Sequence, residues 1–227
     1  MVRRAARPRS EMTQRQQSMP SMNPSTTAAD DAALASAVRQ TRVWVERAVI
    51  GLNLCPFARA AHARKRTRYV GSAATEVATL LAAFETEVRL LLATPVAALE
   101  TTLLIHPFVL NDFIDYNDFF DLADGAIDAL GARGVLQVAS FHPHYRFAGT
   151  AVDDVTNATN RSPHPLLQLL REDSVEKAVG GLADSAAIYQ ANVATLQRLG
   201  WAGWHRLEAE WHGAGGVDEA GAPQRAG

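Results

Sequence analysis

Three histidines, at two Pro-containing turns, are the side chains in this sequence best suited to metal binding or acid–base chemistry. The segments LLIHPF and ASFHPH place His106 and His142 directly after apolar runs, and His144 follows two residues later. Pro143 favours an extended backbone at His142, and residues i and i+2 of an extended chain point to the same side. The three imidazoles could therefore hold zinc or another divalent metal, or share a proton as acid and base. The alternative is that they only satisfy backbone groups.

Cys55 is the second reactive group. It stands at a predicted helix N-cap, followed by Pro56 at the first helical position. The positive end of a helix dipole favours the thiolate, so Cys55 is a candidate nucleophile, redox thiol or metal ligand. A single cysteine can also be a small buried hydrophobe.

A polar loop after His144 contains Asn157, Asn160 and Arg161, directly before a predicted helix start at Ser162. An arginine fork and free N–H groups at a helix terminus together form a cradle for an anion. The loop thus predicts a site for a small polar or anionic substrate. Alternatively, its Asn, Asp and Thr side chains only fold the loop through local turns.

Composition limits the classes of partner. The chain has 227 residues, of which 48% are hydrophobic and 20% charged, with a net charge of −2. This balance lacks the excess of basic residues that is typical of proteins that bind nucleic acid. No apolar run reaches the roughly 18 residues of a membrane span. One cysteine cannot form an internal disulfide, so a reducing, cytoplasmic location is the simplest expectation.

The elements that must position these residues follow from hydrophobic periodicity. Helices are predicted from Asp30 or Asp31 to Gly51, from Pro56 onward, over 75–93 and 111–131, from Ser162 through the leucines at 166–170, near Asp173, and over 184–199. Strands are predicted over 69–71, 101–105 and 135–141. Strands that alternate with helices indicate β-α-β crossovers. We therefore expect an α/β fold with a small, mainly parallel sheet flanked by helices.

This domain is expected to span residues 31–212. Residues 1–30 and 213–227 lack an apolar pattern, so both are predicted to be disordered tails.

Four segments resemble the signature blocks of domain-of-unknown-function family 1415, a bacterial family. The similarity covers roughly residues 38–207 and is carried by RVWVERAVIGLNLCPFARA, TLLIHPFVLNDFIDYNDFFDLAD, VLQVASFHPHYRFAGT and DVTNATNRSPHPLLQLLRE. The resemblance implies no particular activity, cofactor or catalytic residue. The family's pattern usually has an aromatic residue at the position of His164, so His164 is left out of the metal hypothesis.

Together these features favour a small-molecule enzyme. Cys55, His106, His142 and His144 would be its reactive cluster, and Asn157, Asn160 and Arg161 would bind the substrate. Two other hypotheses stay open at this point: a module that binds a ligand or protein without catalysis, and a zinc-type metal-binding protein in which His106, His142 and His144 are ligands.

Overall fold

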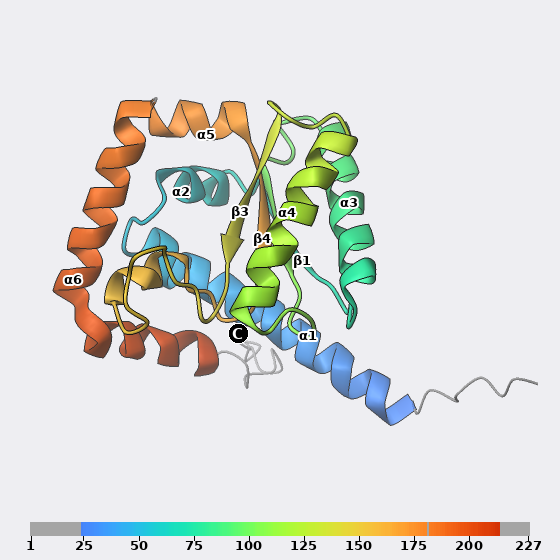
Figure 1. The fold of residues 1–227 in the computed structure, drawn as a ribbon, viewed down its shortest axis with the longest axis horizontal. Helices are drawn as coiled ribbons and strands as arrows, with labels where there is room; N and C mark the ends of the chain where they lie inside the picture. The colour runs from blue at the N-terminus through green and yellow to red at the C-terminus, as the bar shows by residue number, and fades with distance from the viewer. Residues whose placement is uncertain (1–23, 181, 214–227) are drawn as a thin grey trace, which may run out of the picture.

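The computed structural model describes residues 24–180 and 182–213 as a small sheet covered by helices on both faces (Figure 1). The helical elements in chain order are α1 (Pro24–Trp44), the π-helix η1 (Val45–Ile50), α2 (Pro56–Ala63), α3 (Val77–Ala93), α4 (Phe113–Ala129), the 3-10 helix η2 (Val155–Asn160), α5 (Glu172–Val179) and α6 (Leu182–Gly213). The strands are β1 (Thr67–Gly71), β2 (Thr101–Ile105), β3 (Leu136–Phe141) and β4 (Leu166–Arg171).

The α/β class is confirmed, but the prediction of a mainly parallel sheet is wrong. The strand order is β1-β2-β4-β3, in which β1 and β2 are parallel and the other two pairs are antiparallel. The reason lies in residues 166–170, which were predicted as part of a helix and instead form β4. Leu166 pairs with Ile105 on one side and with Phe141 on the other. A short run of leucines fits a buried strand as well as a buried helix, and here two neighbouring ladders decide the outcome.

The two faces of the sheet carry separate apolar clusters. Helices α3 and α4 cover one face, where Phe84 and Phe119 pack with Leu104 and Leu167. Figure 1 shows α2 and α6 on the opposite side. There, Leu103 packs in a cluster with residues of α1, η1 and α6. Alternation along β2 therefore sends Leu103 and Leu104 to different layers.

Several boundaries depart from the sequence predictions. Helix α1 begins at Pro24, so it includes the end of the predicted N-terminal tail, and residues 1–23 lie outside the described residues. The predicted stop at Gly200 is only a break, with φ 62° and ψ 173°, after which α6 continues to Gly213. That continuation buries Trp204 and Trp211 against the sheet cluster. Residues 214–227 of the predicted C-terminal tail also lie outside the described part. Among the described helices, none is long and apolar enough to cross a membrane.

Candidate functional site

His106 and His142 lie at the same edge of the sheet, on the face covered by α4. They follow β2 and β3, which run in the same direction but are not neighbours, because β4 lies between them. The ring of Tyr116 from α4 joins the two histidines: its centroid is 5.8 Å from that of His106 and 5.1 Å from that of His142. The two histidines therefore lie at one edge of the sheet and both pack against Tyr116.

Both histidines are fully buried and are held by backbone groups. In His106, Nδ1 donates to the carbonyl of Val109 at 3.0 Å, and Nε2 has no hydrogen-bond partner in the described part of the chain. In His142, Nε2 donates to the carbonyl of Leu110 at 3.2 Å, and Nδ1 accepts the backbone N–H of His144 at 3.0 Å. Carbonyl oxygens only accept, so these contacts specify one neutral tautomer for each ring.

Burial lowers the pKa of each of these histidines to about 4, and a neighbouring imidazole contributes in the same direction. Both rings are therefore neutral at pH 7. A general base needs a free nitrogen within reach of a substrate, but His142 uses both nitrogens and His106 is inaccessible.

The three metal candidates do not assemble as ligands. His144 is exposed, and its ring centroid lies 5.7 Å from that of His142. In residues 24–180 and 182–213, no three His, Cys, Asp or Glu side chains come together in a group that could hold a metal ion. The structure thus offers no geometric support for the zinc hypothesis.

Cys55 lies on the opposite face of the sheet from the histidines. It is the N-cap of α2, as predicted, and it contacts the clusters formed by α1, η1 and α2. Burial raises the pKa of the Cys55 thiol, and the backbone N–H groups of Ala58 and Phe57, which favour the thiolate, offset this only in part. This direction is opposite to the one expected from the helix dipole alone. The sheet also separates the thiol from the histidine bases with which it was predicted to act.

Cys55 lines a cavity of about 190 Å³ between the sheet, η1, α2 and η2. Trp44, Val49, Leu103 and Phe141 contribute apolar walls. Trp44 packs edge-on against Phe141, with ring centroids 5.4 Å apart. Among the described residues, none of those lining the cavity is charged. The space is therefore suited to an uncharged molecule.

Three side-chain amides in this wall each donate one hydrogen bond through their NH₂ groups and leave their carbonyl oxygens unused. Asn160 donates to the carbonyl of Ser140 at 3.1 Å, and Asn192 donates to the carbonyl of Leu54 at 2.9 Å. Gln168 donates to the hydroxyl of Thr101 at 3.0 Å. The amide oxygens receive no hydrogen bond from the described residues, so they remain available as acceptors for a ligand.

Trp44 contributes its ring, and not its indole N–H, to this wall. The indole N–H has no acceptor within the described part of the chain, but it is fully buried and does not face the open space of the cavity. The unused polar groups of the wall are therefore those of the three amides.

The predicted anion cradle is used inside the protein. Asn157 is fully buried: its Oδ1 accepts the N–H of Phe147 at 3.0 Å and the hydroxyl of Thr150 at 2.7 Å. Arg161 donates to the carbonyls of Tyr145 and Val152, at 3.2 and 2.8 Å. Because 166–171 is a strand, there is no helix terminus at Ser162 to complete the cradle. Only Asn160 of this group reaches the cavity.

Sequence reasoning missed Trp44, Phe141, Gln168 and Asn192 as cavity residues. Gln168 carried a signal, since it is the one polar residue inside the apolar run LLQLL. A polar side chain at a buried strand position needs a partner or a ligand. Trp44 gave no comparable signal, because an aromatic residue on an apolar helix face is ordinary core.

The chain belongs to the family described as "Protein of unknown function (DUF1415)", whose profile matches residues 36–206. The resemblance seen in the sequence is thus confirmed. The match includes every residue of the histidine edge and of the Cys55 cavity. No curated protein and no solved structure matches this chain.

Proposed function

We propose that this protein binds a small, uncharged molecule with hydrogen-bond donors in the cavity next to Cys55. The observation that carries the proposal is the wall itself, in which uncharged residues present three amide oxygens that receive no hydrogen bond from the described part of the chain. Those oxygens specify N–H or O–H groups on the ligand, and the wall of Trp44 and Phe141 favours a planar apolar body.

The volume sets the size of this ligand. A dry apolar cavity of about 150 Å³ accommodates one benzene ring. A cavity of about 190 Å³ therefore fits one ring with a short polar substituent. A carboxylate or phosphate would enter this wall without a cationic partner, which costs several kcal/mol.

This proposal develops the binding-module hypothesis rather than the Cys/His enzyme. The enzyme would need Cys55 to transfer its proton to a nearby base. His106 and His142 pack against Tyr116 on the other face of the sheet, so neither supplies that base. In the proposed role, the protonated Cys55 thiol is a weakly polar part of the wall.

The test compares benzamide with benzoate, which share a ring but differ in charge and in donors. We expect benzamide to bind with a Kd below about 1 mM and to raise the melting temperature, and benzoate to do neither. Isothermal titration calorimetry and a thermal-shift assay on the full chain measure both effects. Equal binding of the two compounds would contradict an uncharged site.

Filling the cavity tests the location. Ala58 lines the cavity, so Ala58→Leu should abolish benzamide binding by occupying its volume. The matched control is Ala82→Leu on the exposed face of α3, which should leave binding unchanged. If Ala58→Leu folds with native helical content and still binds benzamide with wild-type affinity, the cavity is not the site.

A further inference from the structure

A second cavity, of about 360 Å³, lies beside α2 and shares no lining residue with the first. One side is cationic, formed by Arg64 and Arg66 before β1 and by Lys177 of α5. The other side is apolar, and the buried Phe57 is part of it. Such a two-sided cavity matches a ligand with a charged end and an apolar end.

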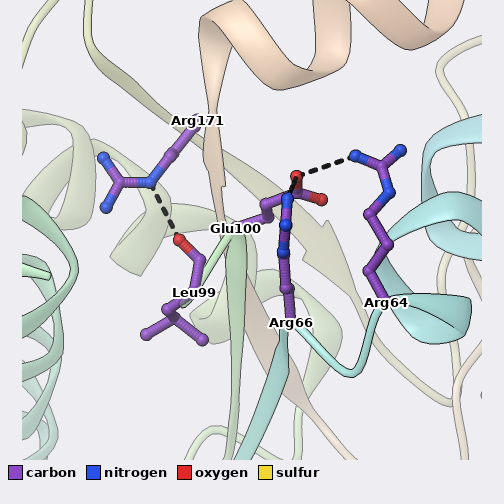
Figure 2. A network of polar contacts seen from close by, with 5 residues as sticks. All are labelled: Arg64, Arg66, Leu99, Glu100 and Arg171. Carbon is purple, nitrogen blue, oxygen red and sulfur yellow. Dashed lines mark hydrogen bonds and ion pairs between the residues drawn. The ribbon is translucent and has the colours of Figure 1, made fainter. Parts of the chain in front are cut away.

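Glu100 organises the cationic side. Its side chain is only 5% exposed, and its Oε1 accepts Nη1 of Arg64 at 3.1 Å and Nη1 of Arg66 at 3.0 Å. Figure 2 shows the two guanidinium groups meeting at this carboxylate, with Arg171 on the other side of it. A buried carboxylate needs such partners, so one Glu100 side chain holds two arginines in fixed positions.

The charges in this cavity do not cancel. Arg64, Arg66 and Lys177 contribute three positive charges, and Glu100 is the one acid among the described lining residues. Each guanidinium carries five N–H donors, and in the described part of the chain Arg64 and Arg66 each use one nitrogen, for Glu100. Lys177 forms no ion pair with the described residues. Several donors and a net positive charge are thus left for a ligand.

We infer that this cavity binds the phosphate group of a small phosphate monoester. The guanidinium groups of the two arginines match the oxygens of phosphate in geometry, and Lys177 adds a positive charge. The hydroxyl of Ser174 adds a neutral hydrogen-bond donor. The apolar wall at Phe57 takes the organic part of the monoester. Glu100 acts as a positioning residue: it holds Arg64 and Arg66 without touching the ligand's phosphate.

The experiment titrates the full chain with phenyl phosphate and, in a second arm, with inorganic phosphate. We expect saturable binding of phenyl phosphate, several-fold tighter than that of inorganic phosphate, by isothermal titration calorimetry and ³¹P NMR. Equal affinities would identify free phosphate as the ligand. The absence of saturable binding of both compounds up to about 10 mM would overturn the site.

Lys177→Gln should weaken binding of phenyl phosphate about tenfold, since it removes one charge-assisted contact. Lys65→Gln is the control: it removes the same charge from the adjacent basic stretch, but Lys65 lines a different depression, next to Arg42 and Glu46. If both variants weaken binding equally, general charge attraction explains it and the site is overturned.

Glu100→Gln separates positioning from charge. If Glu100 positions the two arginines, a folded Glu100→Gln protein should bind phenyl phosphate more weakly although it carries one negative charge fewer, and the melting temperature reports whether the fold survives. Tighter binding by a folded Glu100→Gln protein would show that the negative charge of Glu100 outweighs its hold on the arginines, and would contradict the positioning role. If this variant does not fold, Lys177→Gln still decides the proposal.

Discussion

The hydroxyl of Tyr116 donates a hydrogen bond of 2.8 Å to the backbone carbonyl of Leu166, the first residue of β4. The same oxygen accepts the N–H of Phe141 at 3.0 Å, at the end of β3. One side chain of α4 therefore closes the ends of two paired strands. Burial raises the pKa of Tyr116 strongly, so this hydroxyl keeps its proton.

Tyr116→Phe should lower the free energy of unfolding by about 1–3 kcal/mol, because it removes both hydrogen bonds that the hydroxyl makes to the ends of β3 and β4. Urea denaturation measures the change. Tyr145→Phe is the control, since the Tyr145 hydroxyl makes no hydrogen bond with the described residues. A Tyr116→Phe protein as stable as the control would show that the bridge contributes nothing.

The buried histidines predict a loss of stability in mild acid. Their pKa lies near 4 in the folded chain and at 6.5 as the ordinary value, so the unfolded chain binds more protons between these values. The neutral histidines therefore make their full contribution to the free energy of unfolding above about pH 6.5, and this contribution is lost as the pH falls toward 4. For His106 alone, the free energy of unfolding changes by at most about 1.4 kcal/mol for each pH unit.

Carboxylates also titrate in acid, so the comparison must be made between variants. Urea unfolding of wild type and of His142→Gln at pH values between about 7 and 4 isolates the contribution of His142. We expect the stability of the variant to fall less steeply. Parallel curves for the two proteins would mean that His142 is protonated equally easily in both states.

Cys55 should be alkylated more slowly in the folded protein than in urea. Its pKa is raised by burial, so the thiolate fraction at neutral pH is reduced, and access is limited as well. We expect the rate with iodoacetamide near about pH 7.5 to fall tenfold or more relative to the unfolded chain. Faster alkylation in the folded protein than in the unfolded chain would instead support the hypothesis that Cys55 is an activated thiolate.

Arg171→Lys should destabilise the fold by about 1–3 kcal/mol. Arg171 donates through Nε to the carbonyl of Leu99 at 3.0 Å and through Nη2 to the carbonyls of Leu91 and Thr94, which close the end of α3. A lysine cannot reach all three from one position. Arg89→Lys, in an exposed pair with Glu85, is the control and should change stability little. Equal effects of the two substitutions would contradict this role.

Elements with strong local patterns could be predicted from the sequence. The run at 101–105 contains only β-branched or apolar residues, and 77–93 has clear helical periodicity; both form as expected. β4 could not be identified in this way, since leucine favours a helix locally. Its strand conformation depends on Ile105 and Phe141, which are distant in sequence.

The sequence could predict the place of a candidate residue only where its own strand or turn determines that place. The His-Pro turns suggested that His106 and His142 end neighbouring parallel strands, but β4 lies between β2 and β3, and only the shared direction of these two strands brings the histidines to one edge. The position of Cys55 depends on which face of the sheet α2 covers, and a sequence pattern does not encode that choice. The Cys55 and histidine groups were therefore joined in prediction and are apart in the fold.

The position of β4 between β2 and β3 has a consequence for synthesis. As the chain leaves the ribosome, β1 and β2 can pair with each other, but β3 has no partner within the described sheet until β4 follows it. Until then, Tyr116 lacks its acceptor at Leu166, and β2 has an open edge. Open strand edges and uncovered apolar faces invite wrong pairing. The nascent chain thus keeps these strand edges open until β4, the last strand of the described sheet, inserts between β2 and β3.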